Sequence, residues 1–425
     1  MTRLAISAAA PAQAPGEWRE GWPVVACTFA AMAIGALSFF TQGVFIGPLQ
    51  HELGWTRTQI SAAGFIQSTV CAIMAPFVGQ ALGRIGPRPM VLAGWTLAMA
   101  SFGTLGLIGP RLEVFYLHWL LLAIGIAVGG PVALSAGLAT WFSRHRGLAI
   151  SMALNGVNVV GAIAPLAATA LISGFGWRIA YQALAGGAFL VVFPLLLVWF
   201  HERRPSRSEQ ISTGAVPTGS RDEAGHGRAA ARPAPELTLR QAAGMIRHRL
   251  FACGILLIGG CLVAQIVHFV PDLADRGVGQ IAASRALSAN SLVAILFGAF
   301  GGILLDRLPL PLVATGICVL PAISALILGS GTGNLAGAAV AAGLLGITSG
   351  MTVPLMSVYV ARHVGMRHYG ACFGAMMAMF NLAQGAGAVA LSRVRDLSGD
   401  YSGGFFGVAT VLLVAAVVMA FTGDR

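Results

Sequence analysis

Apolar residues occur along this chain in long runs, and short polar turns separate one run from the next. A helix needs about 20 apolar residues to cross a hydrocarbon core about 30 Å thick. Runs of that length predict twelve transmembrane helices, at residues 22–48, 58–82, 88–109, 113–141, 147–172, 177–200, 250–271, 282–305, 309–330, 335–361, 369–392 and 402–422. The pattern therefore predicts an all-α membrane protein.

The segment 201–249 between the sixth and seventh runs has a different composition, rich in Arg, Ser, Gly and Pro. Such a segment is typical of a flexible linker. Its last part, LTLRQAAGMIRHR from Leu237, predicts a short amphipathic helix at the membrane interface. We expect a cytoplasmic tail at 1–20, a six-helix bundle at 21–200, a cytoplasmic linker at 201–249 and a second bundle at 250–425.

The composition of the 425-residue chain agrees with this pattern, because 56% of the residues are hydrophobic and only 10% are charged. Ordinary soluble proteins carry roughly a quarter of their residues as charge. This shortage excludes a soluble globule, a disordered chain and a coiled coil. The six cysteines all lie in apolar runs without a CxxC pair, so we expect no disulfide, no metal and no cofactor.

The net charge of +11 comes from arginine alone, since the chain contains no lysine. The arginines form short clusters between the runs, without the interleaved aromatics of a nucleic-acid groove. With both termini in the cytoplasm, nineteen of the 26 basic residues lie inside and seven outside. Cytoplasmic loops carry an excess of Arg and Lys, so the arginines predict this orientation.

The two halves of the chain repeat one another at a spacing of 223 residues. Matches of uncommon types recur in this register: Gln42/Gln265, Pro48/Pro271, Ser61/Ser284, Gly79/Gly302, Arg84/Arg307, Pro131/Pro354, Arg144/Arg367, His145/His368, Gly147/Gly370 and Asn158/Asn381. Parallel repeats of this kind build transporters whose substrate sites lie near the membrane midplane, between the halves.

Several stretches resemble the major facilitator superfamily, and within it the monocarboxylate-porter branch. They are WFSRHRGLAISMALNGVNVVGAIAPL from Trp141, GWRIAY from Gly176, GVFIGPLQHELGWTRTQIS from Gly43, VHFVPDLADRGV from Val267 and GLLGITSGMTVPLMSVYVARHVG from Gly343. The resemblance covers nearly everything except the tail and the linker. It implies the major facilitator fold, with twelve helices in two pseudo-symmetric six-helix bundles, and alternating access that is commonly driven by a proton gradient.

The superfamily's GxxxDRxGR signature is similar to GQALGRIGPR from Gly79, where the acidic position is Gly83, and to GILLDR from Gly302. The resemblance suggests a conformational latch, formed by Arg84, Arg88, Asp306 and Arg307. Tight helix packing and a topology signal would account for the same residues. Relatives in this branch often carry an Arg eight positions before the second Asp, where this chain has Gly298. Amide and hydroxyl donors would then hold an anionic substrate.

The spans contain amides rather than charges. Because Asn158 lies eleven residues beyond Gly147, it sits roughly 16 Å deep, near the midplane. In the resembling fold, the spans that carry these amides line the cavity. We therefore expect substrate contacts from Gln42, Gln67, Asn155, Asn158, Gln265, Asn290, Asn381 and Gln384, together with Tyr359. Hydrogen bonding between neighbouring helices is the alternative role.

His268 is the only titratable group well inside a span that is expected to line the cavity. It is a candidate for proton coupling, and a neutral histidine hydrogen-bonded at the interface is the alternative. Asp272, Asp275 and Arg285 surround the expected outer mouth, where they could steer ions or latch the closed gate. Pro131 and Pro354 are expected to bend their helices.

The combined expectation is a monomeric, multi-pass transporter of the bacterial inner membrane that moves a small organic acid together with protons. Its partners would be the substrate, the proton and the lipid bilayer, with no nucleic acid. Efflux of hydrophobic or drug-like compounds is the alternative within the same fold. An enzyme is disfavoured because HExxH, P-loop and serine-elbow motifs are absent from the sequence.

Overall fold

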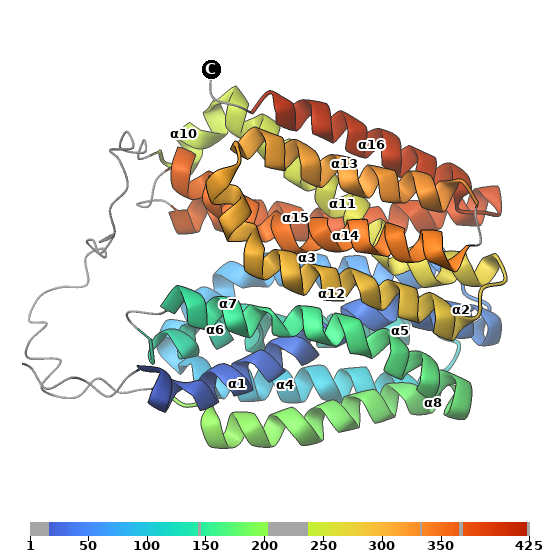
Figure 1. Cartoon of the computed structure of the whole chain (residues 1–425). Helices are drawn as coiled ribbons and strands as arrows, with labels where there is room; N and C mark the ends of the chain where they lie inside the picture. Colours follow the sequence, from blue (N-terminus) through green and yellow to red (C-terminus); the bar gives the residue numbers. More distant parts are fainter. Residues whose placement is uncertain (1–16, 143–145, 203–236, 332–333, 365–368, 423–425) are drawn as a thin grey trace, which may run out of the picture.

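The computed structural model describes residues 17–142, 146–202, 237–331, 334–364 and 369–422 (Figure 1). All regular elements in this part of the chain are helical. They are α1 (Glu17–Gly35), α2 (Leu37–Leu53), α3 (Arg57–Ile85), α4 (Pro87–Thr104), η1 (Leu105–Leu107), α5 (Leu112–Gly129), α6 (Pro131–Ala139), α7 (Arg146–Leu154), α8 (Gly156–Trp199), α10 (Leu239–Gly244), α11 (Ile246–Asp275), α12 (Gln280–Arg307), α13 (Leu310–Gly329), α14 (Leu335–His363), α15 (Tyr369–Ser398) and α16 (Ser402–Ala420).

Eleven stretches of the described chain are long and apolar enough to cross a membrane. One of them, Met152–Trp199, has 48 residues, about twice the length that a single crossing requires. Gly176 interrupts it with φ 83° and ψ 164°, a conformation that only glycine adopts readily. The stretch is therefore two spans, and the predicted twelve-helix architecture is confirmed.

The helices form two bundles, α1 to α8 and α11 to α16, with most of the first below and most of the second above in Figure 1. Helices α3 and α12 lie between, where the bundles meet. The start of α1 and the end of α16 lie at the same end of the molecule, which we call the terminal end. The turns after α2, η1, α11, α13 and α15 lie at the opposite end, which we call the distal end. By the arginine rule, the terminal end is predicted to be cytoplasmic.

Three spans are interrupted near their middle. The first is divided at Ala36 into α1 and α2, and another at Asn155 into α7 and α8. The fourth is divided at Gly130, after which Pro131 starts α6 in the first turn, where proline is tolerated. The predicted bend at Pro131 is thus a break between two helices. Pro354 lies inside the continuous helix α14.

The end of the predicted linker forms the short helix that its sequence suggested. Thr238 and Gln241 make a reciprocal capping box at the start of α10. Met245 has an extended backbone conformation that separates α10 from α11. Helix α11 begins at Ile246, four residues before the expected start of the seventh span. The middle of the linker lies outside the described residues, so its expected flexibility stays a prediction.

Candidate translocation pathway between the two halves

An ion pair joins the two halves at the distal end. Arg57, the first residue of α3, donates from Nη2 to Asp275 Oδ1 at 2.7 Å and from Nη1 to Asp275 Oδ2 at 2.9 Å. Arg395 Nε donates to the same carboxylate at 3.0 Å. Arg57 is 6% exposed, so its charge is withdrawn from water and depends on these partners. Arg57, Asp275, Arg395 and Tyr401 are called the distal latch below.

Tyr401 connects the other residues of the latch to His268 on α11. Its hydroxyl oxygen accepts a hydrogen bond from Arg57 Nη1 at 2.8 Å and lies 3.0 Å from His268 Nδ1. The guanidinium of Arg57 also lies over the Tyr401 ring, 5.2 Å from its centroid. Burial raises the pKa of Tyr401 to about 12, so its hydroxyl keeps its proton at physiological pH.

His268 is fully buried, deeper in the packing than its position near the end of a span suggested. Its Nε2 lies 2.9 Å from Ala388 O and 2.9 Å from Ser392 Oγ. Ser392 Oγ in turn lies 2.6 Å from Ser61 Oγ of α3, across the boundary between the halves. His268 therefore belongs to a polar network that includes both bundles.

The halves meet along two seams that the internal repeat relates to each other. In the α3–α15 seam, Ser61 bonds Ser392 at 2.6 Å. Adding 223 to Ser61 gives Ser284, and subtracting 223 from Ser392 gives Thr169. These two residues bond each other at 2.8 Å in the α8–α12 seam. The sequence repeat is therefore also a repeat of the contacts that close the distal end.

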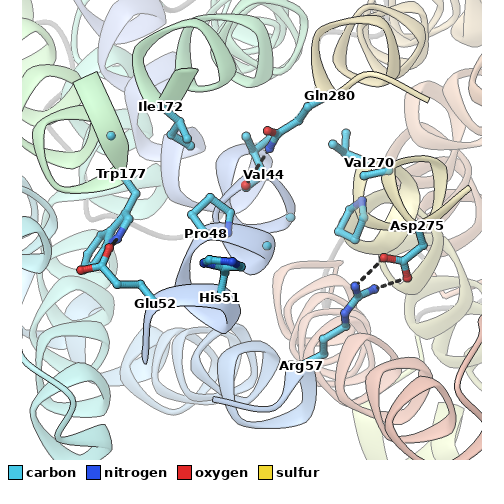
Figure 2. Close-up of a pocket in the computed structure, with 15 residues that line it drawn as sticks. Val44, Pro48, His51, Glu52, Arg57, Ile172, Trp177, Val270, Asp275 and Gln280 are labelled. Carbon is cyan, nitrogen blue, oxygen red and sulfur yellow. Dashed lines mark hydrogen bonds and ion pairs between the residues drawn. The ribbon is translucent and has the colours of Figure 1, made fainter. Parts of the chain in front are cut away.

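A cavity of about 500 Å³ lies between the halves at the distal end. Figure 2 shows Pro48 and His51 at its centre, with the Arg57–Asp275 pair on one side and Trp177 on the other. Gln280 closes another side by donating to Val44 O at 3.1 Å. Polar groups and prolines from α2, α3, α8, α11 and α12 thus surround a space at the expected outer mouth.

Five of the predicted amides are partly exposed: Gln67, Asn155, Asn158, Asn381 and Gln384. Asn158 Nδ2 donates to Asn155 Oδ1 at 3.4 Å, and a Cβ at Gly298 of the other half would lie 3.6 Å from that oxygen. Asn155 therefore faces the C-terminal half. Gln67 accepts from Ser38 at 3.3 Å. Their role in substrate binding stays a prediction.

The other four predicted substrate contacts are buried within their own halves. Gln42 Nε2 lies 3.5 Å from Ile60 O, and Gln265 Nε2 donates to Cys261 O at 3.3 Å. Asn290 Nδ2 lies 3.5 Å from Ser349 Oγ on α14. Tyr359, expected to face the cavity, is instead stacked on Phe251 at 3.5 Å between ring centroids. In this conformation Gln42, Asn290 and Tyr359 link neighbouring helices, which is the alternative role considered for the amides. The bond of Gln265 lies within α11.

The residues of the predicted conformational latch lie at the terminal end. Arg88 Nη2 donates to Leu197 O at 2.8 Å, a contact within the N-terminal half. Arg84 and Arg307 are exposed and make no ion pair with any side chain that the structure describes. The side chain of Asp306 lies outside the described part. A latch at this end stays a prediction.

Sequence reasoning did not single out Arg57, Tyr401, Ser61 or Ser392 as functional residues. Arg57 carried a signal, because it is one of only seven arginines on the expected outer side and it directly precedes an apolar run. Ser61 also carried one through its match to Ser284. Tyr401 has no such signal, since its partners Arg57 and His268 are 344 and 133 residues away.

Comparison with known proteins identifies the family. A family model described as Major Facilitator Superfamily matches residues 28–388. The chain belongs to this superfamily. This match confirms the predicted fold. It also confirms the prediction that the protein is a membrane transporter and not an enzyme.

This major facilitator protein is 27% identical to Monocarboxylate transporter 11 of Mus musculus, over 96% of this chain and 88% of that protein. The expected resemblance to the monocarboxylate branch is confirmed. A shorter match, 33% identical over 28% of this chain and 25% of the other, is to the Fujikurins efflux protein of Gibberella fujikuroi. The solved structure of the nucleoside transporter NupG has a TM-score of 0.71 at 12% identity, covering 95% of this chain and 98% of that one. That likeness concerns the fold.

Proposed function

We propose that this transporter moves a small organic acid, of the monocarboxylate type, together with protons by alternating access. The observation that carries the proposal is the match to a monocarboxylate transporter along nearly the whole of both chains. We further propose a bacterial inner-membrane location with both termini in the cytoplasm, in keeping with the distribution of the arginines.

The arrangement of contacts between the halves is compatible with alternating access. In the described chain, one group of side-chain hydrogen bonds between the halves joins α3 to α11, to α15 and to Tyr401. The other group joins α12 to α2 and to α8. Both groups lie toward the distal end, so the conformation is closed there. Substrate would then reach the amides from the terminal end.

The amides near mid-depth are suited to a carboxylate that lacks a cationic partner. Asn155 and Asn158 are partly exposed and adjacent, and their NH₂ groups are donors. Gly298 lies beside Asn155, at the position where relatives in the branch often carry an arginine. A small anion can be held by such neutral donors at lower electrostatic cost than a buried, unpaired charge requires.

The decisive experiment is uptake of a panel of organic acids into proteoliposomes, with and without an imposed proton gradient. We expect gradient-driven uptake of at least one acid, and its loss in Asn158→Ala and Asn381→Ala with normal expression. Gln182→Ala is the matched control, because this exposed amide lies on the outer part of α8. Uptake that ignores the gradient would rule out proton coupling, and wild-type flux in both asparagine variants would rule out the amide site.

Efflux of hydrophobic compounds is the second candidate function, and the partial match to the Fujikurins efflux protein favours it. It predicts that cells expressing the protein accumulate less of a fluorescent hydrophobic compound than cells expressing Asn158→Ala. Equal accumulation in both strains, together with organic-acid uptake in proteoliposomes, would decide against efflux.

A further inference from the structure

A series of hydrogen bonds runs from Arg57 through Tyr401 and His268 to the backbone oxygen of Ala388. The direction of each bond is assigned from the chemistry of the groups at the two ends. A guanidinium can only donate, so the Tyr401 oxygen accepts from Arg57. The Tyr401 hydroxyl proton is then available to His268 Nδ1, 3.0 Å away, which accepts it when that nitrogen carries no proton. A backbone carbonyl can only accept, so His268 Nε2 carries the proton that is donated to Ala388 O at 2.9 Å.

A neutral imidazole that carries its proton on Nε2 satisfies every bond in this series, because Nδ1 can then accept from Tyr401. A charged imidazole is a donor at both nitrogens. Nδ1 would then donate to the Tyr401 oxygen, which already accepts from Arg57, and the tyrosine hydroxyl would have to turn away from the histidine. A second positive charge would also be buried next to Arg57, and like charges in a region of low dielectric repel strongly.

The charged groups on the elements packed against this network make hydrogen bonds or ion pairs, but one buried oxygen, Asp272 Oδ2, has no partner in the described chain. On α11, Asp272 accepts from Arg276 at 2.8 Å, and Asp275 accepts from Arg57 and Arg395. On α15, Asp396 accepts from the Thr58 hydroxyl at 2.6 Å. No carboxylate in the described chain is hydrogen-bonded to His268. The groups that directly contact the imidazole are therefore one hydroxyl donor, Tyr401, and the polar pair Ala388 O and Ser392 Oγ.

We infer that Tyr401 couples proton binding at His268 to opening of the distal latch, so that the closed latch and a protonated His268 exclude each other. By linkage, the proton that disfavours the closed state binds more tightly to the open state. The inference rests on the proton coupling of the proposed function and names the residue that transmits it. Tyr401 is a positioning residue in this scheme, because it acts through Arg57.

The test measures the distance between the halves at the distal end and needs no substrate. Spin labels are attached to Arg111→Cys and Ser330→Cys, two exposed distal positions in opposite halves, in full-length protein whose six native cysteines are replaced by alanine. Pulsed electron paramagnetic resonance then gives the ratio of open to closed molecules. We expect this ratio to rise about tenfold from about pH 8 to about pH 5, the range in which histidine titrates.

Two conservative variants test the coupling itself. His268→Asn keeps an oxygen acceptor for Tyr401 but cannot be protonated, and it should stay closed at every pH. Tyr401→Phe keeps the ring but removes the hydroxyl, and its open-to-closed ratio should no longer depend on pH. Thr58→Val is the matched control. It removes the hydrogen bond from the Thr58 hydroxyl to Asp396, which joins the two halves near the latch but does not belong to the series Arg57–Tyr401–His268. It should raise the open fraction equally at every pH and keep the pH response.

A wild-type distance that does not change with pH would overturn the inference, as would a full pH response in either His268→Asn or Tyr401→Phe. These outcomes are independent of the uptake experiment. Uptake that ignores a proton gradient overturns the proposed proton coupling, whereas a pH-dependent distance that disappears in Tyr401→Phe still supports the role of Tyr401.

Discussion

The two seams between the halves share their geometry and differ in their chemistry. Both contain a pair of hydroxyl side chains, Ser61–Ser392 in the α3–α15 seam and Thr169–Ser284 in the α8–α12 seam. The position equivalent to His268 in the first half is Phe45, which is stacked on Tyr181 with 3.8 Å between centroids. One seam is therefore titratable at this point, and the other is apolar.

The charged residues differ in the same way. Asp275 is equivalent to Glu52, but Asp275 pairs across the seam with Arg57, whereas Glu52 pairs with Arg178 inside its own half. The residue equivalent to Arg57 is Gln280, which donates to Val44 O across the other seam. Duplication has preserved the contact surfaces, while the ion pair that crosses between the halves in the described chain, Arg57–Asp275, has no equivalent at the other seam.

Among the variants that test this comparison, removal of the Asp275 carboxylate, which comes from α11 and pairs with Arg57 of α3, should have the largest effect. Asp275→Ala leaves the guanidinium of Arg57 buried without its bidentate partner. We expect the closed state to lose about 3 kcal/mol relative to the open state, near the lower bound for breaking a buried pair, because Asp275 is partly exposed. Populations from the spin-label distance measure this loss.

Glu52→Ala is the control for that measurement, because Glu52 is the residue of the first half that is equivalent to Asp275. Its ion pair is exposed and lies within one half, so the open-to-closed ratio should change little. An equal shift in both variants would mean that the two seams do not differ in the way described.

A smaller effect is expected from the equivalent hydroxyl pairs. Ser392→Ala removes a hydroxyl that contacts Ser61, Ala388 O and His268, and it should cost the closed state about 1–2 kcal/mol. Thr169→Val removes the equivalent hydroxyl while keeping the shape, and about 1 kcal/mol is expected. Only Ser392→Ala should also reduce the pH response, and a reduced response in Thr169→Val would contradict the assignment of proton sensitivity to one seam.

The smallest effect concerns the neutral contact at the cavity. Gln280→Leu removes the donor to Val44 O, which lines the cavity and can be solvated there. We expect a loss of about 0.5 kcal/mol of the closed state, at the low end for a hydrogen bond. A pH-dependent change in this variant, measured by the same distance, would be unexpected because neither group titrates.

The candidate site was predictable in part. The depth of Asn155 and Asn158 could be predicted, since the depth of a residue follows from its number along a helix. Both side chains are partly exposed, and their role as a substrate site stays a prediction. The rotation of each helix does not follow from number alone. Tyr359 lies on a predicted cavity-lining span but points to Phe251 within the C-terminal half.

The sequence by itself determined the number of spans, the duplication and the superfamily, because hydrophobic length and a fixed spacing are properties of the linear chain. Only the tertiary structure decided which polar groups meet. Arg57 and Asp275 are 218 residues apart, and His268 and Tyr401 are 133 apart. Their contact depends on the rotation of each helix and the approach of the two bundles, since packing rather than sequence order brings these side chains together.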